Sequence, residues 1–252
     1  MTSFPRIVAS MTIIPSRIGC IRPVMEAVLI QTVPVAPIEL NIPHICQRTG
    51  QTHEIPDWLT GLERVIIYRT EDYGPITKIA PTLLRYTADQ ETYIWSVDDD
   101  CAYPANQLEL LCAVHDPSKR RIPRYGGKLK PDGTVNFWFG EAEVTMFEGC
   151  GGVLYPPDCI GKDFPAYLAL TAANEHCRKN NDLVLAMYFG HHLFPMYLYN
   201  RPTDEVPYMV TGWLDQDPLP ANGHVENYRG FSPLSTRTGL PKLPSMVMGG
   251  AT

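Results

Sequence analysis

Three consecutive aspartates, Asp98, Asp99 and Asp100, are the residues of this 252-residue chain that most clearly suggest chemistry. They follow an apolar run at 92–97 that is typical of a buried strand. Adjacent carboxylates repel one another, and a hard divalent cation relieves that repulsion. Mg²⁺ and Mn²⁺ accept carboxylate and phosphate oxygens together. The acidic run therefore predicts a metal and diphosphate site.

The geometry of a strand suggests which aspartates hold the metal. In an extended segment Asp98 and Asp100 point the same way and Asp99 points away, so Asp98 and Asp100 are the expected metal-binding pair. A solvated acidic turn that caps a following helix is the alternative. The apolar strand before the run and the α/β context favour the metal site.

Candidate partners of a nucleotide follow other predicted elements. Thr12 and Arg17 come after the first strand, at the same sheet edge as the acidic run. There Arg17 would bind a base carbonyl or a phosphate; a surface charge is the alternative. Pro81 is tolerated only in the first turn of a helix, which places Lys78 at or near a helix start. A lysine there suits a diphosphate, although a solvated helix lysine is the alternative.

Further along the chain, a glycine-rich turn precedes a helix that begins with an acid. Gly149, Gly151 and Gly152 permit close backbone approach to a ligand, or form a tight bend. Asp182 lies in the first turn of the helix predicted at 181–190, where an acid also complements the helix dipole. His191 and His192 end that helix, and we interpret them as structural.

Strand and helix signals alternate in the first half of the chain. Strands are expected near 6–12, 36–42, 64–68 and 92–97, and helices near 22–31, 76–88 and 104–115 with Pro104 at a first position. This order predicts an α/β fold with a mostly parallel central sheet and helices on both faces. The second half is expected to hold strands at 134–139, 143–146 and 153–155, helices at 165–178 and 181–190, and a segment at 195–199 that returns to the sheet.

Composition narrows the function classes. The net charge of −6 and the lack of a basic stripe argue against nucleic-acid binding. Seven cysteines, an odd number without C-x-x-C spacing, predict reduced thiols in a cytoplasmic protein and no zinc site. No apolar stretch is long enough to predict a membrane span.

Four segments, in order, resemble GT-A-fold glycosyltransferases. The D-x-D of the acidic run, after 93–97, is similar to their metal-binding motif. Residues 10–18 resemble the first strand and loop of certain small GT-A enzymes, including the first domain of multidomain glycosyltransferases of chloroviruses, which are large algal DNA viruses. Residues 72–78 resemble the second nucleotide-contacting segment, and 151–156 followed by 181–184 resemble the donor-sugar strand and catalytic helix. The resemblance covers about residues 6–200.

The resemblance implies a fold, a domain organisation and an activity. It implies a Rossmann-like GT-A domain at 1–215, with a nucleotide-binding half at about 1–103, an acceptor half at 104–215, and a Pro/Gly-rich extension at 216–252. The implied activity is metal-dependent, inverting transfer of a hexosyl or deoxyhexosyl group from a nucleotide sugar, expected to be a UDP-sugar. The implied acceptor is a hydroxyl of a glycan or glycoconjugate, and the implied cofactor is Mn²⁺ or Mg²⁺.

The resemblance also implies roles for individual residues. Asp182 would be the general base, with Glu148 as the rival candidate. His224 would complete the metal shell of Asp98 and Asp100, as C-terminal histidines do in some GT-A enzymes. The expected contacts to the donor come from Thr12, Arg17, Lys78, Asp98, Asp99, Asp100, Gly151 and Gly152.

Two other functions remain open from the sequence. A sugar nucleotidyltransferase would carry a glycine-rich basic loop after the first strand, and residues 14–19 match that poorly. A non-catalytic nucleotide- or sugar-binding module would show no turnover of a nucleotide sugar.

Overall fold

The computed structural model describes residues 5–115, 122–126, 142–144, 149, 151–200 and 208–209. The predicted strand at 134–139, Glu148, His224 and the extension at 216–252 lie outside these ranges.

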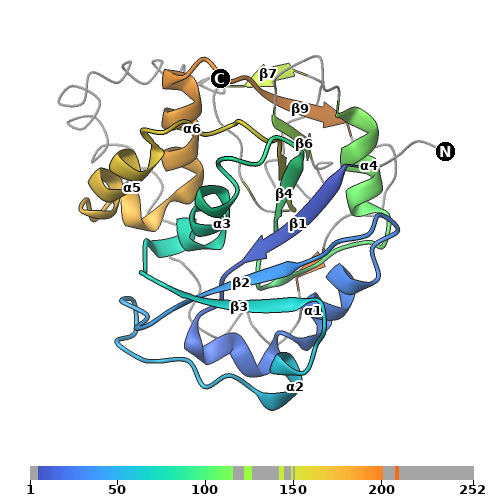
Figure 1. Ribbon diagram of the computed structural model, residues 1–252, viewed down its shortest axis with the longest axis vertical. Coiled ribbons are helices and arrows are strands. Elements are labelled where there is room, and N and C mark those ends of the chain that lie inside the picture. The colour runs from blue at the N-terminus through green and yellow to red at the C-terminus, as the bar shows by residue number, and fades with distance from the viewer. Residues whose placement is uncertain are drawn as a thin grey trace, which may run out of the picture.

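A five-stranded sheet in the order β3-β2-β1-β4-β8 organises the chain (Figure 1). Four strands are parallel, and β8 runs antiparallel to β4. The predicted α/β class with a mostly parallel central sheet flanked by helices is therefore confirmed. The strands are β1 (Arg6–Met11), β2 (Ile38–Pro43), β3 (Val65–Thr70), β4 (Thr92–Ser96) and β8 (Val153–Tyr155).

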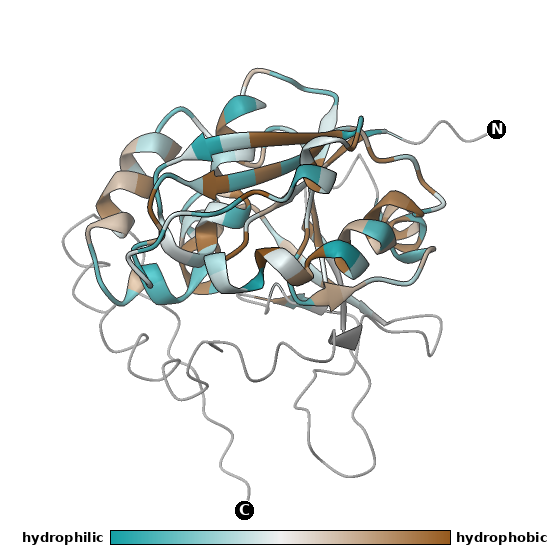
Figure 2. Ribbon diagram, turned by 90° about the horizontal axis from the view of Figure 1, so that it is seen from below, coloured by the Kyte–Doolittle hydropathy of each residue, from teal (hydrophilic) through white to brown (hydrophobic). Residues whose placement is uncertain are grey.

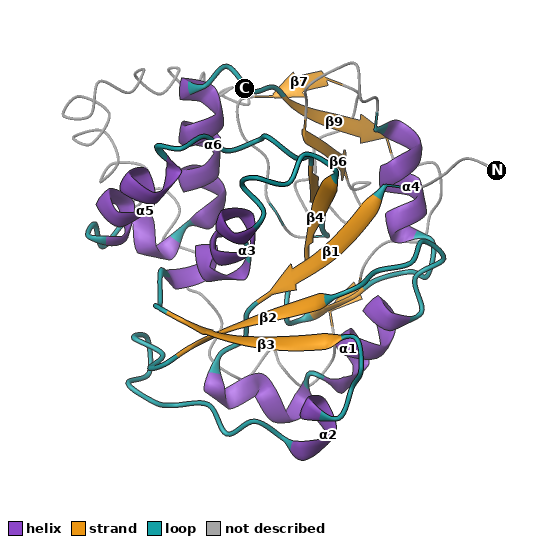
Figure 3. Cartoon of the chain, viewed as in Figure 1, coloured by secondary structure: helices purple, strands orange, loops and turns teal. Residues whose placement is uncertain are grey.

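The helices divide between the two faces of the sheet (Figure 3). One core contains side chains of α1 (Arg22–Leu29), α2 (Asp57–Thr60) and α4 (Gln107–Val114). The other contains side chains of α3 (Ala80–Arg85), α5 (Phe164–Ala172) and α6 (Asn181–His191). No helix in the described ranges is both long and apolar enough to cross a lipid bilayer.

The sheet has two apolar faces because its strands are buried on both sides. Ile7, Ala9 and Met11 of β1 belong to the core with α1, whereas Val8 belongs to the core with α3. This alternation follows the two-residue period of a strand, and doubly covered strands read as continuous apolar runs. The hydrophobic colours along much of the strands in Figure 2 show the same pattern.

Short elements connect the layers. Three 3₁₀ turns precede helices: η1 (Pro15–Cys20), η2 (Gly74–Lys78) and η3 (Cys177–Lys179). Two small sheets accompany the central one, with orders β10-β5 and β6-β9-β7. Their strands are β5 (Cys101–Ala102), β6 (Ile122–Gly126), β7 (Ala142–Val144), β9 (Met196–Asn200) and β10 (Tyr208–Met209).

Some predicted boundaries were wrong. The helix expected at 76–88 is divided into η2 and α3. Pro81 lies in the first turn of α3, because a proline deeper in a helix would remove a hydrogen bond and clash with the preceding turn. The helix expected at 104–115 begins at Gln107, whose N–H donates to the Pro104 carbonyl over 3.0 Å, so Pro104 precedes the helix. The helix expected at 165–178 ends at Ala172 and is followed by η3.

The segment expected to return to the central sheet instead forms β9 in the small β6-β9-β7 sheet. It pairs in parallel with β6 and antiparallel with β7. The antiparallel strand β8 already occupies the edge of the central sheet beside β4. Strand pattern predicts an extended segment but does not identify its partner.

The strand order creates one switch point. From β1 the chain adds β2 and β3 on one side, then places β4 on the opposite side of β1. In open α/β sheets, ligands bind outside the carboxyl ends of the strands at such a point. A ligand site is therefore expected between the segments that follow β1 and β4.

Two glycines provide a matched test of the fold. Gly74, at the start of η2, has φ +79°, and an added methyl group would lie 2.2 Å from the Arg178 carbonyl oxygen. We expect Gly74→Ala to lower the free energy of unfolding by about 2 kcal/mol or more, measured by urea denaturation. Gly190 lies in α6 with nothing within 4 Å. Gly190→Ala should be neutral or stabilising by up to about 0.5–1 kcal/mol. Equal effects of the two substitutions would contradict this account of η2.

Candidate active site

The acidic run lies directly beyond β4, at the switch point of the sheet. The strand ends at Ser96, and Asp99 and Asp100 form a turn before β5. The side chains of Asp98, Asp99 and Asp100 are 18%, 16% and 24% exposed. Three mostly buried carboxylates in succession require positive charge close by.

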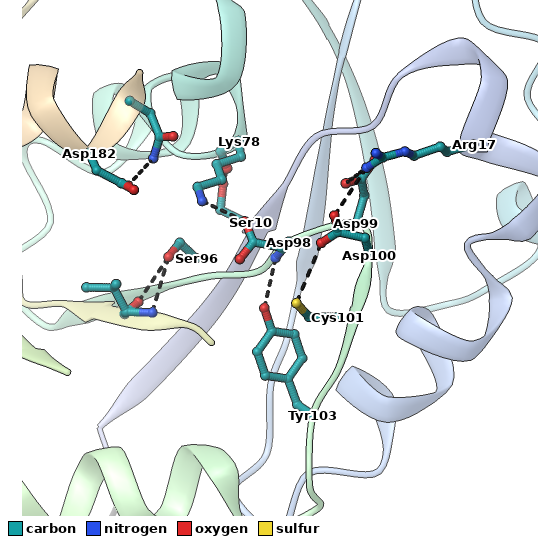
Figure 4. Close-up of polar contacts among 12 residues, drawn as sticks. Ser10, Arg17, Lys78, Ser96, Asp98, Asp99, Asp100, Cys101, Tyr103 and Asp182 are labelled. Atoms are coloured by element: carbon teal, nitrogen blue, oxygen red, sulfur yellow. Dashed lines mark hydrogen bonds and ion pairs between the residues drawn. The ribbon is translucent and has the colours of Figure 1, made fainter. Parts of the chain in front are cut away.

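Two cations from other segments supply that charge (Figure 4). Arg17, in η1 after β1, places Nη1 at 3.1 Å from Oδ1 of Asp99 and at 3.3 Å from Oδ2 of Asp100. Lys78, at the end of η2, places Nζ at 2.6 Å from Oδ1 of Asp98. The structure thus brings Arg17, Lys78 and the acidic run to one place, although the three segments are far apart in the sequence.

The two cations divide the aspartates between them. Asp98 pairs with Lys78, whereas the turn at Asp99 and Asp100 brings both of these carboxylates to Arg17. A strictly extended segment would have grouped Asp98 with Asp100. The chain turns after Asp98, so strand alternation no longer decides the direction of the following side chains.

Burial and charge shift the pKa values of these groups. Burial raises the pKa of Asp99 to about 7, and the Arg17 guanidinium only partly offsets this. Burial, followed by the Asp98 carboxylate, raises the pKa of Asp100. Burial by itself lowers the pKa of Lys78, but the carboxylates of Asp98 and Asp182 outweigh that effect and the pKa rises above its usual value. Positive charge added here would favour the ionised aspartates.

One carboxylate oxygen indicates where a cation would fit. Oδ2 of Asp98 is buried and has no hydrogen-bond partner among the described residues. Carboxylate oxygens are the ligands that Mg²⁺ and Mn²⁺ prefer. Within the described ranges, no group of three or more His, Cys, Asp or Glu side chains is placed to hold a metal ion. Asp98 and Asp100 stay the predicted metal-binding pair, with oxygens of a bound phosphate as the expected further ligands, as is usual for Mg²⁺ at a substrate site.

Asp182 lies next to the same cluster, on the other side of Lys78 (Figure 4). It occupies the first turn of α6, whose N-cap residue Asn180 accepts the N–H of Leu183 over 3.0 Å. A methyl group added at Gly149 would lie 2.7 Å from Oδ1 of Asp182 and 3.3 Å from Nζ of Lys78. A glycine at 149 therefore leaves room for the carboxylate and the ammonium, which both lie where its side chain would be.

Three other residues predicted to contact the donor have structural partners. The Thr12 hydroxyl donates to the Asn41 carbonyl over 2.6 Å. Gly152 has φ +88°, and an added methyl group would lie 2.6 Å from Nε1 of Trp95. The Gly151 carbonyl accepts from Nε2 of Gln107 over 2.8 Å. These contacts explain the glycines as a packed turn and leave their contact with a donor as a prediction.

A buried polar network beneath the site was not predicted from the sequence. The Ser10 hydroxyl donates to the Lys78 carbonyl over 2.5 Å, and its oxygen accepts from Nδ2 of Asn41 over 3.1 Å. Nδ2 of Asn41 also donates to Oγ1 of Thr82 over 3.0 Å. Oδ1 of Asn41 accepts from Arg85 over 2.7 Å. The signal was present in the sequence, because polar residues inside an otherwise apolar strand need partners.

The role of Tyr103 was also not predicted from the sequence. Its hydroxyl accepts the backbone N–H of Asp98 over 2.9 Å, and its ring packs edge-on against Trp95. The phenol thereby fixes the main chain where the acidic run begins. Nothing in the local sequence pattern distinguishes this tyrosine from one that only fills the core.

Comparison with known proteins supports the fold but not a family. No protein-family model and no curated protein matches the sequence. The solved structure of S. aureus TarS residues 1–349 in complex with UDP is similar, with a TM-score of 0.50 and 11% sequence identity. The match covers 90% of this chain and 64% of that one. TarS is a glycosyltransferase. The chain described here has a similar fold. No finding bears on the chlorovirus resemblance, which stays a prediction.

The loop that carries Arg17 depends on a buried histidine. Nε2 of His53 donates to the Ile13 carbonyl over 2.7 Å, between β1 and η1. The His53 side chain is buried, and burial lowers its pKa below the usual 6.5, although the hydrogen bond to the Ile13 carbonyl partly offsets this effect. Protonation of His53 therefore opposes folding.

This burial predicts a pH dependence of stability. With the folded pKa below 6.5, the unfolded chain binds the proton more readily, so stability falls as pH falls below 6.5. When the pH is lowered from about 7.5 to 5.5, the free energy of unfolding should fall less in His53→Gln than in the wild type. The exposed His44, changed to Gln, should keep the wild-type loss. Urea denaturation at both pH values measures this; equal losses in wild type and His53→Gln would refute it.

Proposed function

We propose that this chain is a metal-dependent glycosyltransferase that transfers a sugar from a UDP-sugar to a hydroxyl of a glycan or glycoconjugate. The observation that carries the proposal is the arrangement at the switch point, where the acidic run beyond β4 faces Arg17 and Lys78. Carboxylates and cations together suit a metal-bound diphosphate. The similarity to TarS, which is solved with UDP, supports the same class of donor.

Each residue of the site has a role in this proposal. Asp98 and Asp100 would hold Mn²⁺ or Mg²⁺, which supplies Lewis-acid stabilisation of the leaving diphosphate when bound. Arg17 and Lys78 would bind phosphate oxygens or the base. We keep His224 as a further metal ligand and Thr12, Asp99, Gly151 and Gly152 as donor contacts.

Asp182 would act as the general base. Its carboxylate accepts the proton of the acceptor hydroxyl as that oxygen bonds to the anomeric carbon. The bond between the anomeric carbon and the diphosphate oxygen breaks, and its electron pair leaves with the diphosphate. A single displacement of this kind inverts the anomeric configuration. The Lys78 ammonium interacts electrostatically with Asp182.

The wider organisation is proposed as well. We keep a nucleotide-binding half at about 1–103, an acceptor half at 104–215 and a C-terminal extension at 216–252. A cytoplasmic location, expected from the cysteines, stays a prediction. A nucleotidyltransferase is less well supported, because η1 is a 3₁₀ turn that begins with Pro15 rather than a glycine-rich loop. Turnover of a nucleotide sugar would separate an enzyme from a binding module.

Removal of one metal ligand tests the donor site. Loss of a residue that hydrogen-bonds a metal ligand typically weakens metal affinity by about 10–100-fold, and a direct ligand contributes at least as much. We therefore expect Asp100→Ala to weaken UDP binding in the presence of Mn²⁺ by at least about 10–100-fold. Calorimetry with UDP, with and without Mn²⁺, measures this. Asp57→Ala, which removes an exposed acid in the first turn of α2, is the matched control and should bind UDP like the wild type. Unchanged affinity in Asp100→Ala would remove this residue from the site.

Replacement of the base tests the mechanism. Asp182→Asn keeps the size of the side chain but cannot accept a proton, so we expect turnover to fall by about 10²–10⁴-fold with UDP affinity nearly unchanged. Donor hydrolysis at saturating Mn²⁺ serves as the assay if no acceptor is known. Asp163→Asn changes the N-cap acid of α5 and should keep turnover. Near-normal turnover in Asp182→Asn would make Glu148 the next candidate.

A further inference from the structure

Lys78 already pairs with one oxygen of the carboxylate that would hold a metal, and the other oxygen, Oδ2, has no hydrogen-bond partner among the described residues. Nζ of Lys78 lies 2.6 Å from Oδ1 of Asp98, and the two side chains are only 10% and 18% exposed. Arg17 is engaged with the other two aspartates of the run. A divalent cation bound to Asp98 would lie close to a buried ammonium, and like charges at such a distance repel strongly where water is scarce. A metal on Oδ2 would therefore compete with the Lys78 ammonium for the negative charge of Asp98.

The main chain of Lys78 is fixed, so only its side chain can respond. The Lys78 carbonyl accepts the Ser10 hydroxyl over 2.5 Å. Ser10 is itself held by Asn41 and lies 2.7 Å from Oγ1 of Thr82, and Ser10, Asn41 and Thr82 are fully buried. The long, flexible lysine stem is therefore the part of the residue that can carry the ammonium elsewhere.

The ammonium has a second anionic neighbour. The carboxylate of Asp182 interacts with it electrostatically, and both groups lie close to the point where a side chain at Gly149 would begin. A lysine placed between two carboxylates can leave one without becoming unpaired, which makes the exchange less costly than exposing a buried charge. The diphosphate of a donor would offer a third anionic partner close by.

We propose that Lys78 is a built-in counter-ion of Asp98 that is exchanged for the divalent metal and then binds the nucleoside diphosphate. This inference rests on the proposed function. It gives Lys78 two opposed effects: its ammonium competes with the metal for Asp98 while no nucleotide is present, and it contributes to nucleotide binding once the metal is in place. A lysine that only stabilised the fold would show neither effect.

The test compares two ligands in the same variant. In Lys78→Met, Mn²⁺ alone should bind about tenfold more tightly than in the wild type, because the competing charge-assisted contact is gone. UDP at saturating Mn²⁺ should bind about tenfold more weakly, because a cation facing the diphosphate is gone. Lys78→Arg keeps a charge and should leave the affinity for Mn²⁺ alone close to that of the wild type. Electron paramagnetic resonance reports free Mn²⁺, and calorimetry reports UDP binding.

Control variants separate this effect from general charge loss. The control is Lys179, an exposed lysine whose Nζ lies 2.7 Å from the Glu175 carboxylate. Lys179→Met should leave both affinities unchanged. In an Asp98→Asn background, Lys78→Met should no longer tighten Mn²⁺ binding, because the carboxylate for which both cations compete is absent. If Lys78→Met is poorly folded, the rise of its melting temperature with Mn²⁺ replaces the titration and should exceed that of the wild type.

The outcomes distinguish the two proposals. If the affinity of the wild type for UDP does not depend on Mn²⁺, both the metal-dependent function and this inference are overturned. A wild type that needs Mn²⁺, with a Lys78→Met variant whose affinity for Mn²⁺ alone is unchanged or weaker, overturns the inference alone. Tighter Mn²⁺ binding with weaker UDP binding supports it.

Discussion

Mutual repulsion among three mostly buried carboxylates governs the arrangement of this site. Asp98, Asp99 and Asp100 can lie together at the end of β4 only because Arg17 and Lys78 offset their charge. Those cations come from the segments that follow β1 and β3. Because β1, β2, β3 and β4 run parallel, the segments that follow β1, β3 and β4 lie at the same edge of the sheet. The fold thus places at the switch point the charges that the acidic run requires.

Beneath this surface, a polar network holds the main chain of Lys78 in place. Ser10 and Asn41 point from β1 and β2 toward Thr82 and Arg85 of α3, and Ser10 reaches the Lys78 carbonyl. Buried polar groups are costly unless they are hydrogen-bonded, so a network with this many partners defines one arrangement of strand and helix. These contacts fix the backbone of Lys78 and do not involve its ammonium.

The similarity to TarS and the chemistry of the site are independent arguments. At 11% identity, the similarity concerns the path of the backbone. One fold hosts many functions, so the proposed transfer reaction depends on the side chains of this chain, above all on Lys78 between Asp98 and Asp182.

The sequence by itself determined the α/β class, the succession of strands along the chain up to β4 and the position of the acidic run at a strand end. These features follow from local patterns: apolar runs, helix periodicity and the positions of proline. The tertiary structure decided which cation pairs with which aspartate, that β9 lies outside the central sheet, and that Asp182 and Lys78 both lie against Gly149. The physical reason is that a local pattern shows which residues are buried. The residue packed opposite each of them comes from distant parts of the chain, and only the folded arrangement selects it.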